Sequence, residues 1–411
     1  MNAAAMASAV RIAIRNLTRH RGRTAMTLAA IAFGVAALVL TGGFIDDMFT
    51  QLREVTIQSR LGHLQVSREG YAVQGRRDPF GHLIEDPREV GAALAGDPRV
   101  AALSSRLDFQ GLLNNGRSDL PIVAEGIEVR KEGAAGEPLT LLAGRRLTPD
   151  DRFGALVGEG VAQAMKLAPG DVVTLMANTP GGALNTLDFR VAGVFRTFSK
   201  DFDDRAVRIP IDAARELLSV GGAHGVVVSL NDTAATDAVA AKLRGALGSR
   251  GYEVRTWLEL DDFYPKALAL YQRQFGVLQL IVLAIVALTV ANSVNMTAFE
   301  RQGEYGTVRA LGVRGRGVFA MIMLENLLLG VAGAAIGLAC GALLAVAISG
   351  VGIPMPPPPN SNSAYVARIQ LSPSVLATAA LIGAGATVAS AIYAAIRVSR
   401  TPIAWALRQN V

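Results

Sequence analysis

Four long stretches of this 411-residue chain contain no Asp, Glu, Lys or Arg. They run from 24 to 45, 276 to 297, 327 to 348 and 374 to 396. A helix needs about 20 apolar residues to cross about 30 Å of hydrocarbon, and each stretch meets that length. Because 51% of all residues are hydrophobic, the chain is also too apolar for an ordinary soluble protein. The sequence therefore predicts an α-helical membrane protein with four transmembrane helices.

The charged residues are unevenly distributed. Segment 46–271 carries 26 Lys and Arg against 31 Asp and Glu. Three short segments, 1–23, 298–317 and 397–411, carry twelve arginines against two glutamates. Arginines beside membrane spans mark the cytoplasmic side, so we expect both termini and segment 298–317 in the cytoplasm of a bacterial inner membrane. The net charge of +6 then reflects membrane topology, and we expect no nucleic-acid partner.

Segment 46–271 predicts a mixed α/β domain on the extracytoplasmic side, between the first two spans. A strand followed by a helix is indicated near each end of the segment, and strand and turn signals fill the part between, about 137–216. We therefore expect one subdomain with a second inserted into it. The predicted strands are 63–67 and 225–230, and the predicted helices are 87–95 and 234–247.

The remaining segments flank the spans. Residues 1–23 predict a cytoplasmic amphipathic helix, because apolar residues alternate there with arginines. Residues 318–349 predict an interfacial lead-in followed by the third span. The connection 350–373 contains five prolines between Pro354 and Pro359, which exclude helix and sheet interior and predict a stiff surface loop. Whether this loop touches a partner or acts as a spacer stays open. The tail 397–411 is expected in the cytoplasm.

Motifs for catalysis and for cofactor binding are missing from the sequence. No P-loop pattern occurs, so we expect ATP and Mg to be bound by a partner ATPase. The four histidines are isolated, and neither His-Glu-x-x-His nor Cys-x-x-Cys spacing is present, which predicts no metal site. No Gly-x-Ser-x-Gly sequence supplies a nucleophile. We expect a non-catalytic transporter subunit without cofactors of its own.

Small and polar residues recur inside the spans. Gly333, Gly337 and Gly341 are four residues apart in the third span, and Gly383 lies in a similar row of small residues in the fourth. Such rows let helices approach closely in lipid, and we expect them to pack within the subunit rather than at a dimer contact. Near the cytoplasmic end of the second span, Asn292, Ser293 and Asn295 are expected to hydrogen-bond between helices.

The most specific sequence in the chain is segment 297–312. It combines an Arg-x-x-Glu-x-Gly core, beginning at Arg301, with Arg-Ala-Leu-Gly, beginning at Arg309, and is followed by Glu325 and the glycine-rich third span. This pattern resembles the FtsX-like permeases of the MacB, FtsX and LolC/LolE group. Segments 14–23 and 155–160 agree with it, and Gly62-His-Leu-Gln-Val resembles the LolC/LolE branch, which handles lipoproteins.

The resemblance implies a permease subunit of an ABC transporter whose short cytoplasmic helix docks in a cleft of the ATPase. It implies two ATPase copies and a second permease, either a second copy of this chain or a related chain. The alternative is that the arginines of this segment only follow the charge rule for cytoplasmic loops. The residues that would contact the ATPase are Glu300, Arg301, Glu304, Arg309 and Leu311.

Two functions fit this family. The first is extraction or movement of a lipid-anchored or hydrophobic substrate, such as a membrane lipid or lipoprotein, on the extracytoplasmic side. The alternative is a mechanotransmitting scaffold of the FtsX type that activates an extracytoplasmic hydrolase without transport. A periplasmic partner is compatible with both. Extraction would require a membrane cavity, for which the candidate lining residues are Phe33, Val35, Phe44, Val277 and Leu280.

Overall fold

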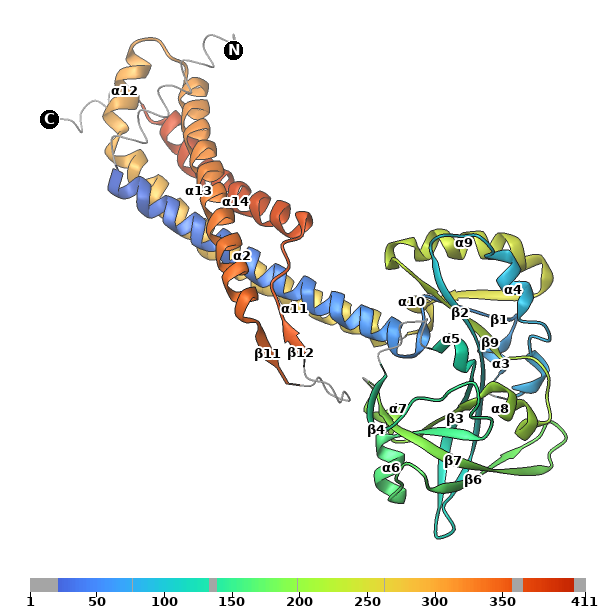
Figure 1. Ribbon diagram of the computed structural model, residues 1–411. Coiled ribbons are helices and arrows are strands. Elements are labelled where there is room, and N and C mark those ends of the chain that lie inside the picture. Colours follow the sequence, from blue (N-terminus) through green and yellow to red (C-terminus); the bar gives the residue numbers. More distant parts are fainter. Residues whose placement is uncertain are drawn as a thin grey trace. The chain divides into compact units, whose positions relative to one another are not determined.

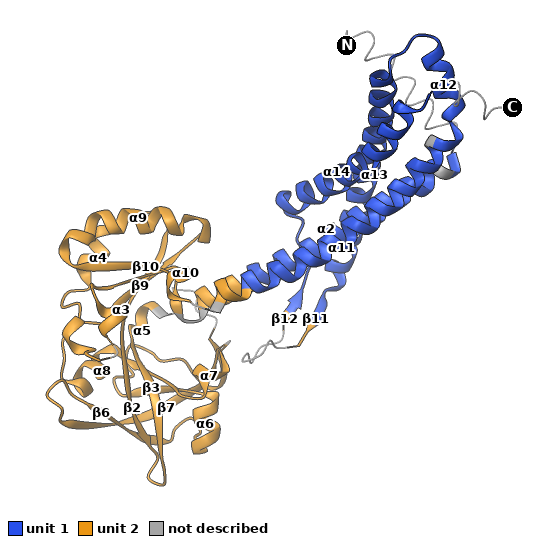
Figure 2. Cartoon of the chain, turned by 180° about the vertical axis from the view of Figure 1, so that it is seen from behind, with its two compact units in different colours: residues 1–50, 268–354, 366–411 blue, residues 51–267, 355–365 orange. Residues whose placement is uncertain are grey.

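The computed structural model describes residues 21–75, 77–132, 139–197, 199–261, 263–356 and 365–402. The chain divides into two compact units, which Figure 2 colours separately. The helical unit comprises Met1–Thr50, Leu268–Pro354 and Val366–Val411, and the α/β unit comprises Gln51–Ala267 and Met355–Tyr365. Most of the predicted amphipathic helix at 1–23 and most of the tail at 397–411 lie outside the described residues.

Among the described residues, four long helices and one short helix form most of the helical unit (Figure 1). Each long helix contains a segment that is long and apolar enough to cross a membrane, judged by length and composition. The predicted count of four such helices is confirmed. The long helices are α2 (Arg21–Thr56), α11 (Phe263–Glu300), α13 (Gly315–Val351) and α14 (Pro373–Arg400), and the short helix is α12 (Gln302–Ala310).

Two of the long helices extend well past their apolar stretches. Helix α2 continues to Thr56, although the apolar stretch ends at 45, and α11 begins at Phe263, although its apolar stretch begins at 276. Hydropathy identifies only the part of a helix that is apolar enough for lipid. Polar residues with high helix propensity, such as Gln51 and Glu54, continue the helix beyond that part. A π-helical turn then follows α2, and Gly62, with φ +64°, ends it.

Glycines hold α13 directly against α2. A Cβ on Gly333 would lie 2.8 Å from Ile31, and one on Gly337 would lie 2.7 Å from the carbonyl oxygen of Ala32. Gly341 meets α2 in the same way one turn later, at Ala36 and Val39. Because the glycines have no side chain, the two helices touch through their backbones, as in other membrane helix pairs.

The α/β unit is built on one sheet of ten strands. The strand order is β10-β1-β9-β2-β3-β8-β5-β7-β4, and β6 pairs with β2 and β7. The pairing is mostly antiparallel, with β3–β8 and β5–β7 parallel. The strands are β1 (Leu64–Arg68), β2 (Val100–Asn114), β3 (Asp119–Ile127), β4 (Thr140–Gly144), β5 (Gly154–Gly158), β6 (Val172–Asn178), β7 (Leu184–Arg196), β8 (Ala206–Pro210), β9 (Gly225–Leu230) and β10 (Tyr252–Thr256).

Helices cover this sheet and enclose its apolar cores. One core lies around β1, β9 and β10 with two of the helices, α4 and α9, and a larger core lies around β2, β3 and β5–β8 with α6 and α8. The mixed α/β class predicted for this segment is confirmed. The helices are α3 (Tyr71–Gln74), α4 (Arg88–Ala93), α5 (Val129–Glu132), α6 (Glu159–Met165), α7 (Lys200–Asp203), α8 (Ile211–Leu218), α9 (Thr236–Leu247) and α10 (Trp257–Leu260).

The predicted inserted subdomain at about 137–216 has no sheet of its own. Strand β2 pairs with β9 along its first half and with β3 and β6 along its second half, so it belongs to both cores. A 15-residue strand can do this because it is nearly three times as long as the commonest strands, which have about 5–6 residues, and extends through both cores. The larger core accordingly begins at Leu107, well before residue 137.

The two ends of the proline-rich connection form short β-strands, although the prolines predict a loop. Strand β11 (Ile353–Met355) pairs with β12 (Tyr365–Ala367), so Pro354 lies in a strand. A two-stranded sheet has only edge strands, and an edge position tolerates proline because its missing N–H is not needed there. Residues 357–364, with the other prolines of the run after Pro356, lie outside the described residues.

The α2–α13 contact can be tested by adding one methyl group to a glycine of α13. Gly337→Ala should lower the thermal midpoint of the purified protein in detergent, at a cost of about 1–3 kcal/mol, because the backbone of α2 has to move. Gly350→Ala on the same helix is the control, since a Cβ there meets nothing within 4 Å. Equal midpoints for the two variants would contradict the close approach of α13 to α2.

A buried histidine makes the α/β unit sensitive to acid. The Nδ1 atom of His224 accepts a hydrogen bond from the backbone N–H of Asp108 at 3.1 Å, and the ring stacks on Tyr71 at 5.4 Å. Burial lowers the pKa of His224 from 6.5 to about 4. The unfolded chain therefore binds this proton more tightly than the folded chain does, and the free energy of unfolding falls as the pH drops from about 6.5 towards about 4.

His224→Gln should flatten this pH dependence, because glutamine can accept the same hydrogen bond and does not titrate. The measurement is urea unfolding of the full chain in detergent between pH 7.5 and pH 4, followed by near-ultraviolet circular dichroism. If wild type and variant lose stability in parallel over this range, His224 is not the group responsible.

Candidate functional site

The junction between α11 and α13 is the most densely connected polar region of the helical unit. Helix α11 ends at Glu300, and Arg301 leaves helical geometry with φ −97° and ψ 12° before α12 begins. After α12, Gly312 turns the chain with φ +98°, a conformation that glycine adopts easily, and α13 begins at Gly315. Arg301 and Gly312 thus set α12 off as a separate short helix between α11 and α13 (Figure 1).

Arg301 binds two carboxylates and one aromatic ring. One of its Nη atoms donates to both carboxylate oxygens of Glu325 on α13, at 2.9 and 3.0 Å. Its Nε atom donates to Glu304 at 2.9 Å, and its guanidinium lies 5.2 Å from the ring centre of Tyr305. Arg301 is only 6% exposed, so its charge is withdrawn from water and depends on these partners.

Apolar packing fixes α12 from its other side. Tyr305 is buried, and burial raises the pKa of its phenol, which therefore stays neutral. Arg309 donates a hydrogen bond to the backbone carbonyl of Thr401, just beyond α14. Together these contacts join α12 to α13 and to the end of α14 as one rigid assembly. Tyr305 packs in a cluster with Val318, Ile322, Ala395 and Val398.

Large apolar side chains at the ends of α12 point away from this assembly. Leu311 is 82% exposed, and Phe299, at the end of α11, is 60% exposed. Val313 in the turn before α13 is exposed as well. An exposed leucine that follows a firmly held helix is suited to insert into a pocket of another protein. The described residues of this site thus present apolar side chains that a binding partner could bury.

The five residues predicted to contact an ATPase do not all reach the surface. Glu300, Glu304 and Leu311 are exposed, and Arg309 is half-buried. The expectation for Arg301 needs correction, because its guanidinium is buried against Glu325 and Tyr305 and is not available to a partner. The sequence analysis placed Arg301 among the residues that would contact the ATPase, and it did not single out Tyr305.

The predicted membrane-cavity residues also divide into two groups. Phe33, Val277 and Leu280 are exposed and Phe44 is half-buried. Val35 is 1% exposed and lies in the apolar core between the helices, where a Cβ on Gly383 of α14 would meet it at 2.3 Å. Val35 therefore cannot line a cavity. Val35 lies two residues after Phe33, and side chains two residues apart in an α-helix point to nearly opposite sides.

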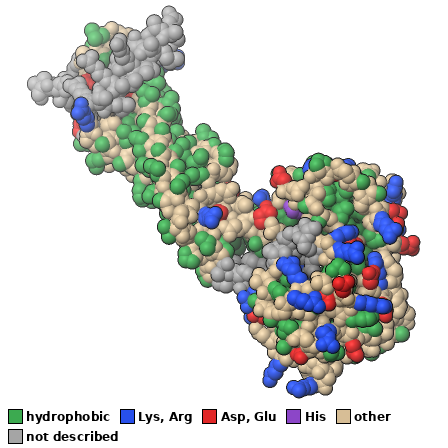
Figure 3. All heavy atoms as spheres, in the orientation of Figure 1, with side chains coloured by type: hydrophobic (Ala, Val, Ile, Leu, Met, Phe, Trp, Pro, Cys, Tyr) green, Lys and Arg blue, Asp and Glu red, His purple; other side chains and the backbone are tan. Residues whose placement is uncertain are grey.

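The surfaces of the two units differ in chemistry. Hydrophobic side chains cover the face of the helical unit seen in Figure 3, whereas basic and acidic side chains are scattered over the α/β unit. Among the described residues, no group of three or more His, Cys, Asp and Glu could hold a metal ion. The lone cysteine, Cys340, is exposed on α13.

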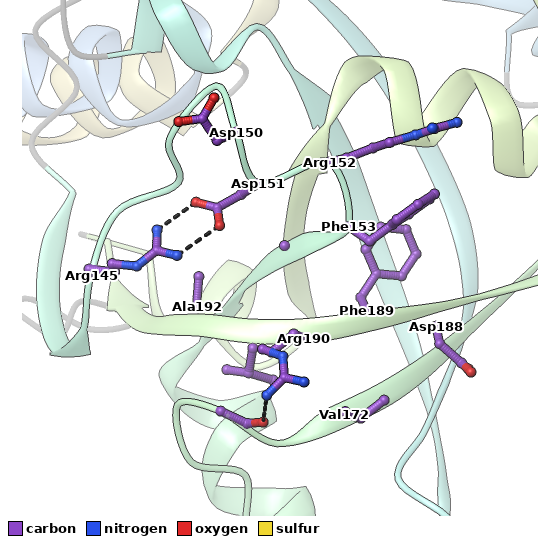
Figure 4. Close-up of a pocket in the computed structure, with 13 residues that line it drawn as sticks. Arg145, Asp150, Asp151, Arg152, Phe153, Val172, Asp188, Phe189, Arg190 and Ala192 are labelled. Carbon is purple, nitrogen blue, oxygen red and sulfur yellow. Dashed lines mark hydrogen bonds and ion pairs between the residues drawn. The ribbon is translucent and has the colours of Figure 1, made fainter.

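A hollow of about 630 Å³ lies in the α/β unit beside β7 and was not foreseen from the sequence (Figure 4). Arg145 binds Asp151 through two hydrogen bonds of 2.5 and 2.7 Å, and Arg190 reaches the carbonyl of Gly170 at 3.4 Å. The lining includes three arginines and three aspartates. Because their charges balance, the hollow favours neither an anion nor a cation, and we assign it no role.

Comparison with known proteins agrees with these features. The MacB-like periplasmic core domain family matches residues 24–246, and the FtsX-like permease C-terminal family matches residues 276–403. The macrolide export ATP-binding/permease protein MacB of Rhodospirillum rubrum is 28% identical over 85% of this chain and 54% of its own length. The lipoprotein-releasing system transmembrane protein LolE of Haemophilus influenzae is 19% identical over 77% of this chain and 76% of its own.

Among solved structures, the periplasmic region of MacB from Actinobacillus actinomycetemcomitans covers 49% of this chain and 92% of that structure, with 17% identity and a TM-score of 0.36. The chain spans about half the length of several of the curated relatives that it matches. Family matches cover both the α/β unit and the last three long helices. The chain belongs to the MacB-like family of ABC transporter permeases, which confirms the expected resemblance. Its family and its four apolar helices make it a membrane protein.

The ion pair between Arg301 and Glu325 can be tested by removing one carboxylate charge at a time. Glu325→Gln leaves the Arg301 charge buried with one carboxylate, and we expect a loss of about 3–5 kcal/mol of stability. Glu304→Gln is the matched control, because that carboxylate is half-exposed and its loss should cost about 0–1 kcal/mol. Thermal unfolding in lipid nanodiscs measures both, and equal losses would show that the Glu325 contact is not the one that fixes α12.

Proposed function

We propose that this chain is the membrane-spanning subunit of an ABC transporter that moves a lipid-anchored or hydrophobic substrate on the extracytoplasmic side. A separate ATPase subunit would supply the energy and would bind the ATP and Mg. The observation that supports this most strongly is the geometry of α12, which is anchored by Arg301 and Tyr305 and presents Leu311 to solvent. A short helix held in this way can pass on a force applied at its exposed end.

Docking of Leu311 in a pocket of the ATPase would remove this apolar side chain from water. A leucine that is 82% exposed forgoes about 1.5–3 kcal/mol available from burial. A few residues that fill pockets of the partner carry most of the binding energy of many interfaces. Glu300 and Glu304 are exposed nearby and would lie at the rim of the contact. Arg301 would act from within by holding α12 in place.

Two continuous helices supply the mechanical connection. Helix α2 has 36 residues and α11 has 38, so they are about 54 and 57 Å long at 1.5 Å per residue. Each runs unbroken from the apolar segment to the border of the α/β unit. A helix transmits displacement along its axis because its backbone hydrogen bonds resist stretching and compression. Movement at the ATPase would therefore reach the extracytoplasmic domain through α2 and α11.

The names of the relatives guide the choice of substrate. One relative is called a lipoprotein-releasing protein and another a macrolide exporter, and both names describe amphiphilic or hydrophobic cargo. We propose a complex with two ATPase copies and a second permease in the bacterial inner membrane, with both termini in the cytoplasm. The exposed Phe33, Val277 and Leu280 are the candidate contacts for the apolar part of the cargo.

Leu311→Asp should abolish ATPase docking while the fold survives. The tagged full-length chain is purified from native membranes, and the copurified ABC ATPase is quantified by mass spectrometry. We expect at least a 30-fold loss of affinity, which corresponds to about 2 kcal/mol for an anchor residue. Leu142→Asp is the matched control, an exposed leucine on β4 of the α/β unit. Full ATPase recovery with Leu311→Asp would contradict the proposed docking site.

The same preparation tests the substrate class. Material retained by the wild-type complex is identified by mass spectrometry, and lipoproteins or amphiphilic small molecules are expected. If only bulk phospholipid is found while the ATPase is bound and active, transport of a lipid-anchored cargo is contradicted.

A further inference from the structure

The chain enters the α/β unit from α2 through a buried histidine. His63 follows Gly62, which ends the π-helical turn after α2, and only 7% of His63 is exposed. Its backbone N–H donates to the carbonyl of Val228 on β9 at 3.0 Å, and its carbonyl accepts from the backbone N–H of Trp257 on α10 at 3.0 Å. The backbone of His63 is therefore held between β9 and α10.

The hydrogen bonds of the His63 ring determine where its proton lies. The Nδ1 atom accepts a hydrogen bond from the backbone N–H of Leu230 at 3.1 Å. Because a backbone N–H can only donate, Nδ1 carries no proton, and the neutral imidazole has its single proton on Nε2. The Nε2 atom lies 3.1 Å from Oγ1 of Thr233, to which it therefore donates.

The hydroxyl of Thr233 extends this network to α2. It donates to the carboxylate of Glu54, in the last turn of α2, at 3.0 Å. Thr233 also begins the short turn that leads into α9, and Asp232 caps that turn by accepting from the N–H of Ala234 at 2.9 Å. One hydroxyl group thus connects the end of α2 with the start of α9. The three side chains of this α2 latch are Glu54, Thr233 and His63.

A hollow of about 450 Å³ lies beside the α2 latch. Glu54 and Thr233 line it, together with the carboxylates of Asp232 and Asp237. Arg53 is the one basic residue among the described residues that line the hollow. Protons from the solvent can therefore reach the latch, although His63 itself is buried.

Protonation of His63 is incompatible with the hydrogen bonds of the latch. A second proton must go to Nδ1, because Nε2 already carries one. The Nδ1 proton and the N–H of Leu230 would then be two donors facing each other without an acceptor. The ring relieves this conflict by turning away from Leu230, and the same rotation withdraws Nε2 from Thr233.

We propose that the α2 latch is acid-sensitive: neutral His63 fastens the end of α2 to the start of α9, and protonation of His63 at Nδ1 releases it. The consequence for coupling rests on the proposed function. Movement passed along α2 would reach α9 through the latch only while the latch is closed. Acid on the side of the α/β unit would then weaken the connection between the ATPase and this unit.

The charges around His63 agree with a latch that is closed at neutral pH. Burial lowers the pKa of His63, Glu54 of α2 and Asp232 raise it, and Arg53 lowers it. On the side of α10, Glu259 pairs with an arginine of α9 at 2.8 Å. Because the net effect is a lowered pKa, the closed form binds the proton more weakly than an open form with a hydrated ring. The latch therefore opens as the pH falls below the ordinary range of histidine.

Tryptophan fluorescence of the full-length chain in lipid nanodiscs tests the proposal. The chain has two tryptophans, so Trp405→Phe leaves Trp257 as the only one. Trp257 lines the hollow and is 7% exposed. Between pH 7.5 and pH 4.5 we expect its quenching constant with acrylamide to rise at least twofold. His63→Gln keeps a donor for Thr233 and does not titrate, so its quenching should stay low. No rise in the parent chain, or the same rise in His63→Gln, would overturn the proposal.

Two neighbouring charges distinguish titration of His63 from a structural role. Glu54→Gln keeps an oxygen that accepts from Thr233, but it removes a negative charge that favours the imidazolium, so the midpoint of the quenching curve should move to lower pH. Arg53→Gln removes a positive charge and should move the midpoint to higher pH. Shifts in the same direction, or no shift in either variant, would contradict titration of His63.

The hydroxyl is tested by a matched pair. Thr233→Val preserves the shape of the side chain but cannot connect His63 with Glu54, so the quenching of Trp257 should already be high at pH 7.5. Thr233→Ser keeps the hydroxyl and should follow the parent chain. Equal quenching of the two variants at pH 7.5 would show that the hydroxyl does not hold the latch closed.

Two further comparisons make the outcome specific. His224→Gln should leave the quenching curve unchanged, and a lost acid response in this variant would assign the response to His224 and overturn the latch. The measurements need neither ATP nor the ATPase. Failure of the latch would therefore leave docking at Leu311 untouched, and full ATPase recovery with Leu311→Asp would contradict the docking site while the latch could still open in acid.

Discussion

The buried ion pair between Arg301 and Glu325 determines how the helical unit can respond to a partner. Removing a guanidinium and a carboxylate from water costs several kcal/mol for each group, and only close pairing offsets that cost. Arg301 belongs to the start of α12, whereas Glu325 belongs to α13, so the pair exists only while the two helices keep their relative position. Rotation of α12 alone would leave a buried charge without its partner. The ion pair therefore ties the position of α12 to that of α13.

The position of α13 is tied in turn to that of α2 through contacts that allow little relative movement. The row of Gly333, Gly337 and Gly341 brings the backbone of α13 close against α2, where it meets backbone atoms of Ala32 and Ala36 and the β-branched side chains of Ile31 and Val39. Helix α2 then continues without a break to Thr56. A buried ion pair, a backbone contact and an unbroken helix thus follow one another. The route connects α12, through α13, to the end of α2 at Thr56.

The sequence was sufficient for the properties that depend on local composition. Apolar stretches located the four long helices, and the recurrence of small residues located the α13 row. What it could not supply were contacts between distant residues. Arg301 was expected among the residues that contact the ATPase, and its burial depends on Glu325, 24 residues later. The continuity of the sheet was missed for the same reason, since β1 pairs with β10 across almost the whole α/β unit. The error at Val35 was avoidable, because helix geometry alone places it opposite Phe33.

The spans present two kinds of helix face, and their difference bears on how two copies could work together. The glycine row of α13 is occupied within the chain by α2, so it cannot also bind a second copy. The outward face of α11 carries bulky side chains such as Leu278, Ile285 and Leu288, and a helix packed on such a face lies about 8–10 Å away, without backbone contact. Within the described residues, the α11 face is therefore open to lipid or to another helix, whereas the α13 row is filled by α2.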